Sequence, residues 1–113
     1  MLADAHRKAA EDIEKTILTL QTAPYAARLV IEGAWGTAFH WIAFSCEIKH
    51  QSHQDGEARL QAFLRRQGEE VVGDWWENLE HVRQDGWYGE NTGPPFVQHA
   101  LDLLERVREW ASQ

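Results

Sequence analysis

The chain is poor in cysteine, proline and basic residues, and it contains no long apolar run. Its 113 residues include one cysteine, Cys46, three prolines and 11 lysines and arginines. A lone cysteine excludes an internal disulfide. No apolar run approaches the roughly 20 residues that span a bilayer, and the N-terminus lacks the apolar core of a signal peptide. We therefore expect a cytoplasmic protein with no membrane contact.

The scarcity of basic residues also limits the kinds of partner that the chain can bind. Asp and Glu number 18, so the formal net charge is -7 with the histidines neutral. Proteins that bind nucleic acid nonspecifically carry clustered Lys and Arg, which neutralise phosphates and release counterions. General nucleic-acid binding is therefore disfavoured, whereas a local pocket for one nucleotide or a short RNA stays open.

What the sequence does contain is apolar residues at three- and four-residue steps, which indicate helices. The predicted helices span 3–21, 24–50, 57–66, 69–84 and 95–111. The segment 86–95 holds three glycines and two prolines and is predicted to be a loop. With no strand pattern, we predict a single all-α domain over 1–113. Its architecture would be an up-and-down antiparallel helical bundle of four long helices plus one short helix.

The apolar stripes of these helices give the expected core. On the first helix the stripe is Ala9, Ile13, Ile17 and Leu20, with Glu14 on an outer face. On the second helix it consists mostly of small residues: Ala26, Val30, Gly33, Ala34, Thr37, Ala38, Trp41, Ile42 and Ser45. Because glycine inside a helix costs roughly 1 kcal/mol against alanine, Gly33 and Gly36 indicate close approach of another helix, within the chain or across a dimer. Local unwinding at these glycines is the alternative.

The six tryptophans stand out against this background. Trp75 belongs to the predicted stripe of the fourth helix, and the adjacent Trp76 lies about 100° further round, so one can fill the core while the other faces outward. Trp87 and Tyr88 fall in the predicted loop. Tryptophan, tyrosine and arginine dominate binding interfaces, and exposed aromatic rings also stack on bases.

No catalytic or cofactor motif is present. The chain lacks a nucleophile elbow, a phosphate loop and a dinucleotide fingerprint, and we predict no catalytic residue, no metal and no cofactor. Cys46, His50 and His53 would approach metal-ligand spacing only if the second helix continued through His50. The simpler interpretation is a solvated helix end whose histidines offset the helix dipole. The role of His99 stays open.

Two stretches nevertheless resemble one protein family. The run EGAWGTAFHWIAFSCEIKH (residues 32–50) resembles the small-residue helix with an FH pair found in HEPN domains (higher eukaryotes and prokaryotes nucleotide-binding). The run WWENLEHVRQDGWYG (residues 75–89) resembles the family's helix that ends in an arginine before a loop. The resemblance covers about residues 5–110.

The resemblance implies an all-α bundle, frequent homodimers, and roles from nucleotidyltransferase partner to toxin ribonuclease. Ribonuclease members place a polar residue after the helix-end arginine and a histidine four to six residues further on. Here Gln84 follows Arg83, but those later positions hold Tyr88, Gly89 and Glu90. The departure argues against RNA cleavage.

Our leading hypothesis is a non-catalytic HEPN-like bundle that forms a homodimer. It would bind a nucleotide-type ligand or a protein partner, such as a nucleotidyltransferase, in a groove lined by His40, Arg83, Trp87 and Tyr88. The alternative is a degenerate metal-independent ribonuclease of toxin–antitoxin type that uses Arg83. A third hypothesis is a purely structural interaction domain in which Arg83 only pairs with an acid such as Glu80.

Overall fold

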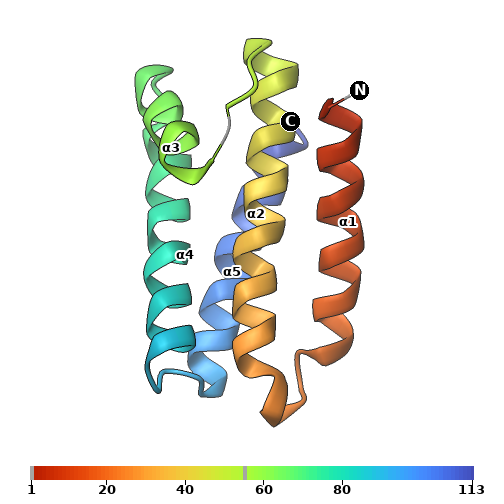
Figure 1. Ribbon diagram of the computed structural model, residues 1–113, viewed down its shortest axis with the longest axis vertical. Helices are drawn as coiled ribbons and strands as arrows, with labels where there is room; N and C mark the ends of the chain where they lie inside the picture. Colours follow the sequence, from red (N-terminus) through yellow and green to blue (C-terminus); the bar gives the residue numbers. More distant parts are fainter. Residues whose placement is uncertain (1, 55) are drawn as a thin grey trace.

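Five α-helices make up most of the computed structural model, which describes residues 2–54 and 56–113; this part of the chain contains no strand. In chain order the elements are α1 (Leu2–Leu20), the 3₁₀ turn η1 (Pro24–Ala26), α2 (Ala27–His50), α3 (Glu57–Arg66), α4 (Glu70–Tyr88) and α5 (Pro94–Ala111). The four long helices run alternately up and down, and the short α3 lies beside the upper part of α4 (Figure 1). The predicted all-α bundle is confirmed. None of the described helices combines the length and apolarity that a membrane span requires.

Helix α2 is the central element and packs against α1, α4 and α5. Its predicted stripe is confirmed, because every member is buried except Gly33, which is half-buried. A Cβ atom on Gly33 would lie 2.3 Å from Cγ2 of Ile17, so this glycine permits close packing of α1 on α2. A Cβ on Gly36 would meet nothing within 4 Å. The close approach is therefore confirmed at Gly33 only, and the alternative of local unwinding is wrong because α2 is continuous.

The boundaries of α3 agree with the prediction, and its end is set by Gly68, which has a φ of +78°. The end of α4 was predicted wrongly. The helix does not stop before Asp85 and Gly86 but continues to Tyr88. Arg28 accounts for the extra turn, because its guanidinium donates hydrogen bonds to the carbonyl oxygens of Gly86 (2.9 Å) and Gly89 (3.1 Å).

Two residues lie on faces other than those predicted. Glu14 is buried between α1, α2 and α5, although its position suggested an outer face. Trp76, and not Trp75, fills the core of α4, with 3% of its surface exposed. Which of the two tryptophans faces the core depends on the rotation of α4 about its axis. That rotation is set by how α4 packs against the neighbouring helices.

Candidate functional site

The four predicted site residues lie in three different environments. Arg83 projects from α4 toward α2, His40 lies against α1, and Trp87 and Tyr88 are exposed in the last turn of α4. In the described residues no hydrogen bond or ring contact joins His40 to Arg83, or either of them to the two exposed aromatic residues. The structure thus gives these residues separate partners.

Arg83 is held by two carboxylates and an indole ring. Its Nε lies 2.9 Å from Oε2 of Glu32, its Nη1 lies 3.0 Å from Oε1 of Glu80, and its guanidinium carbon lies 4.5 Å from the ring centroid of Trp35. Partial burial opposes the charged form, but the two carboxylates outweigh it and raise the pKa of Arg83. The pairing with Glu80 that the third hypothesis requires is present.

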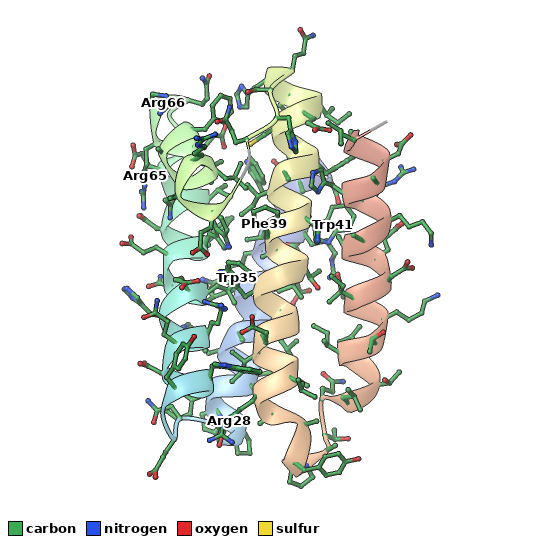
Figure 2. The ribbon with its side chains drawn as sticks, in the orientation of Figure 1. Arg28, Trp35, Phe39, Trp41, Arg65 and Arg66 are labelled. Atoms are coloured by element: carbon green, nitrogen blue, oxygen red, sulfur yellow. The ribbon has the colours of Figure 1, made fainter. Side chains whose placement is uncertain are left out.

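A pocket of about 340 Å³ opens beside this arginine, between α2, α3 and α4. We call it the tryptophan pocket. Its lining residues are Trp35, Glu57, Ala58, Gln61, Trp76, Glu77, Glu80, His81 and Gln84. The indole rings of Trp35 and Trp76 stack with centroids 6.1 Å apart and an interplanar angle of 24°, and Phe39 packs 5.8 Å from Trp76. In Figure 2, Trp35 and Phe39 lie on the side of α2 that faces α3 and α4.

Unpartnered polar atoms concentrate on the residues of this pocket. Nε1 of Trp35, Nε1 of Trp76, Oε1 of Gln61 and Oε2 of Glu80 are all buried without a hydrogen-bond partner in the described part of the chain. A buried polar group without a partner costs about 1–3 kcal/mol, so such groups are rare unless a water or ligand satisfies them. Two donors and two acceptors on the residues of this pocket therefore lack a partner.

Charge limits what such a molecule can be. Glu57, Glu77 and Glu80 line the pocket, and His81 is the only basic side chain among the lining residues. Arg83 next to the pocket is already neutralised by Glu32 and Glu80. Like charges at short range repel strongly where water is partly excluded. The pocket thus suits neutral or cationic groups and disfavours phosphate.

A second polar cluster surrounds His40, close to the N-terminus of α1. Nδ1 of His40 lies 2.9 Å from Nδ1 of His6, and the ring of His6 also stacks on His53 with centroids 5.5 Å apart. Nδ1 of His53 lies 2.9 Å from Oε1 of Glu47. Partial burial lowers the pKa of both His6 and His40, because desolvation disfavours the charged imidazolium.

The combination of Cys46, His50 and His53, which the sequence offered only as the less favoured alternative, does not form this cluster, although α2 does continue through His50. The Cys46 thiol is buried in the core, and the ring of His50 packs edge-on against Phe63 at 5.7 Å. The ligand atoms that do come together belong to His6, Glu47 and His53, all within 4.8 Å of one another. These are the described residues that could hold a metal ion.

The sequence did not predict the tryptophan pocket or the polar cluster around His40. Trp35, Gln61 and Trp76 come from three helices, and nothing in their spacing along the chain indicates that they meet. His6 is an isolated histidine on an amphipathic helix, 34 residues from its partner His40. A contact of that kind depends on how α1 packs against α2.

No protein-family model matches the chain, and neither does any curated protein or solved structure. The resemblance to HEPN domains, the nucleotidyltransferase partner and the toxin–antitoxin role remain predictions from the two sequence stretches.

Proposed function

We propose that this chain is a non-catalytic binding module whose tryptophan pocket takes a flat, nitrogen-rich ligand of the nucleobase class. The observation that carries the proposal is the coincidence of stacked indole rings with four unpartnered polar atoms on the residues of one pocket. The volume of about 340 Å³ lies within the range of small-molecule sites.

The aromatic wall supports a planar ligand. Stacking of a base on an aromatic side chain contributes about 1–3 kcal/mol. The indole N–H groups can donate to ring nitrogens or carbonyl oxygens of a base, while Gln61 and Glu80 can accept from its amino groups. A nucleobase carries donors and acceptors around one flat ring and so matches both features.

The acidic lining distinguishes a nucleobase or nucleoside from a nucleotide. A phosphate next to Glu57, Glu77 and Glu80 would be repelled, and Arg83 would have to leave Glu32 and Glu80 to bind it. The same pairing gives little support to a ribonuclease that depends on Arg83. We therefore expect the base to enter the pocket and any phosphate to stay outside it.

The test is calorimetric titration with adenosine, guanosine, cytidine and uridine and with their 5′-monophosphates. We expect at least one nucleoside to bind about tenfold more tightly than its monophosphate. The variant Trp35→Phe keeps a ring but removes the indole N–H, and loss of one hydrogen bond to the ligand should weaken binding roughly tenfold. Trp110→Phe is the matched control, because Trp110 lies outside the pocket and donates to Glu69. Absence of binding by every nucleoside at millimolar concentration, or equal affinity of Trp35→Phe and the native chain, would refute the proposal.

Self-association is the second function that a specific observation favours. Aromatic and aliphatic side chains are exposed at the end of the bundle where η1 and α2 begin and α4 ends (Figure 1): Tyr25, Leu29, Trp87, Tyr88 and Phe96. Tyr25 and Tyr88 are 88% and 78% exposed. We propose that a second copy of the chain covers this end, because a two-fold dimer needs only one self-complementary surface.

A further inference from the structure

The polar cluster beside α1 carries an inference that is independent of the tryptophan pocket. We propose that His6, Glu47 and His53 bind a divalent transition-metal ion, with Zn²⁺ as the reference ion, and that His40 positions His6 for this role. The three ligands come from α1, from α2 and from the segment that follows α2. Two imidazoles and one carboxylate are a known ligand set for zinc, and three protein ligands leave a coordination position open.

The distances are close to those that a metal needs. The ligand atoms of the three residues all lie within 4.8 Å of one another, and Nδ1 of His53 is only 2.9 Å from Oε1 of Glu47. In a tetrahedral zinc site with bonds of 2.0–2.2 Å, ligand atoms are separated by about 3.3 Å. Small side-chain rotations close the remaining gap, and His53 is exposed and lies outside the helices.

Glu47 contributes a carboxylate that is largely buried. Its side chain is only 12% exposed, and the partner of Oε1 is Nδ1 of His53 at 2.9 Å, a pair that is ionic only when His53 is protonated. A buried carboxylate charge is costly unless it is paired. An ion held jointly by Glu47, His53 and His6 would neutralise that charge.

His40 completes the arrangement without being one of the three ligands. The Nδ1 atoms of His6 and His40 are 2.9 Å apart, so one of them must carry the proton. When His6 donates from Nδ1, its Nε2 keeps the lone pair that a metal requires. Imidazole ligands are commonly fixed in this way by a hydrogen bond from the second ring nitrogen.

The chain itself brings His53 back to α2. Gln51 ends the helix in the left-handed conformation, with a φ of 53° and a ψ of 38°, and its N–H donates to the carbonyl of Cys46. Among the described residues it is the only one besides glycine with a positive φ. Such a conformation is disfavoured for a residue with a side chain. It turns the chain so that residue 53 lies over the end of α2.

The test uses the full chain with any affinity tag removed and Zn²⁺ in competition with a chromogenic chelator. We expect one ion per chain, with at least tenfold weaker binding in each of the variants His53→Ala and Glu47→Gln. His40→Leu, which removes the acceptor for Nδ1–H of His6, should weaken binding roughly 10- to 100-fold, as expected for a positioning residue. His81→Ala and His99→Ala remove exposed histidines outside the cluster and should bind as the native chain does.

Two further measurements distinguish loss of the metal site from loss of the fold. Circular dichroism checks that each variant is folded, and His53→Ala should be folded because residue 53 lies outside the helices. The absorption spectrum of bound Co²⁺ should change in Glu47→Gln and His53→Ala but not in His99→Ala. Zn²⁺ binding weaker than about 100 μM, or equal loss of binding in the cluster variants and the His81 and His99 controls, would overturn the proposal.

Discussion

At the scale of single residues, Glu14 is the only charged side chain buried in the described part of the chain. Arg108 of α5 donates a charged hydrogen bond to one of its oxygens, and Nε1 of Trp41 lies 3.5 Å from the other. Sequence periodicity could not identify this burial, since a glutamate between apolar positions normally faces water. Its partner is 94 residues away along the chain. The contact forms only when α1, α2 and α5 pack together.

The first prediction concerns this ion pair. The variant Arg108→Ala leaves a carboxylate that is 12% exposed without its cation, and we expect a loss of about 2 kcal/mol in the free energy of unfolding. The value is below the range for fully buried pairs because the Arg108 side chain is 38% exposed. The double variant Glu14→Met with Arg108→Met should recover most of that loss, because neither charge is then buried alone. Urea unfolding measures both. Equal stability of Arg108→Ala and the native chain would contradict the prediction.

The second prediction concerns the reactivity of Cys46. Burial, with a contribution from nearby carboxylates, raises the pKa of this thiol to about 12. The reactive thiolate is therefore on the order of a thousandfold scarcer at pH 8 than in an exposed cysteine with a pKa of 9.0. We expect the folded chain to react with a disulfide reagent only very slowly at pH 8 and the urea-unfolded chain to react at once. Rapid reaction of one equivalent of the reagent with the folded chain would contradict this prediction.

At the scale of helices, the sequence correctly predicted the helix ends that depend only on residues nearby in the chain. Gly68 ends α3 because it adopts a left-handed conformation, and the prediction placed that boundary correctly. The pair Asp85 and Gly86 carries an equally good turn signal, yet α4 continues through it. Arg28, 58 residues from Gly86, satisfies the carbonyl oxygens of the last turn. A boundary that depends on such a contact cannot be read from neighbouring residues.

The third prediction compares two glycines on the same helix. Gly33→Ala places a Cβ 2.3 Å from Cγ2 of Ile17, whose branched side chain has little freedom in a helix. We expect a net loss of about 1–3 kcal/mol in the free energy of unfolding. Gly36→Ala meets open space and should stabilise α2 by up to about 1 kcal/mol. Thermal unfolding of the two variants is the measurement, and the opposite order of stability would contradict the packing of α1 on α2.

Helix assembly also explains why the candidate sites could be predicted only in part. The sequence singled out Arg83 and offered pairing with Glu80 as one hypothesis, because these residues are one helical turn apart. The sequence also predicted that one of the neighbours Trp75 and Trp76 fills the core while the other faces outward. The stacking of Trp76 on Trp35 and the approach of His6 to His40 depend on the rotation of each helix about its axis. Those rotations result from packing the whole core.

At the scale of the whole molecule, the bundle separates its surfaces by position along a body 40 Å long. The polar cluster of His6, His40, Glu47 and His53 includes the first turns of α1 and the segment after α2. The exposed aromatic residues gather where α2 begins and α4 ends (Figure 1). The tryptophan pocket lies between these ends, beside α3. The exposed aromatic end is therefore separate from the proposed metal site, whereas the pocket and the histidines share Phe39, whose ring centroid lies 5.8 Å from Trp76 and 5.4 Å from His40.

The last prediction uses this separation to test the proposed dimer. Replacing Trp87 and Tyr88 together by serine removes two exposed aromatic side chains from the end of α4, where their loss leaves the core intact. We expect the native chain to sediment as a dimer at micromolar concentration and the double variant to sediment as a monomer with unchanged helix content. The variant Val71→Ser is the matched control, because Val71 is 60% exposed at the start of α4, far from that end, and should leave the dimer intact. A native chain that stays monomeric at 100 μM would exclude the dimer, while a dimer unaffected by the double variant would show that a different surface forms it.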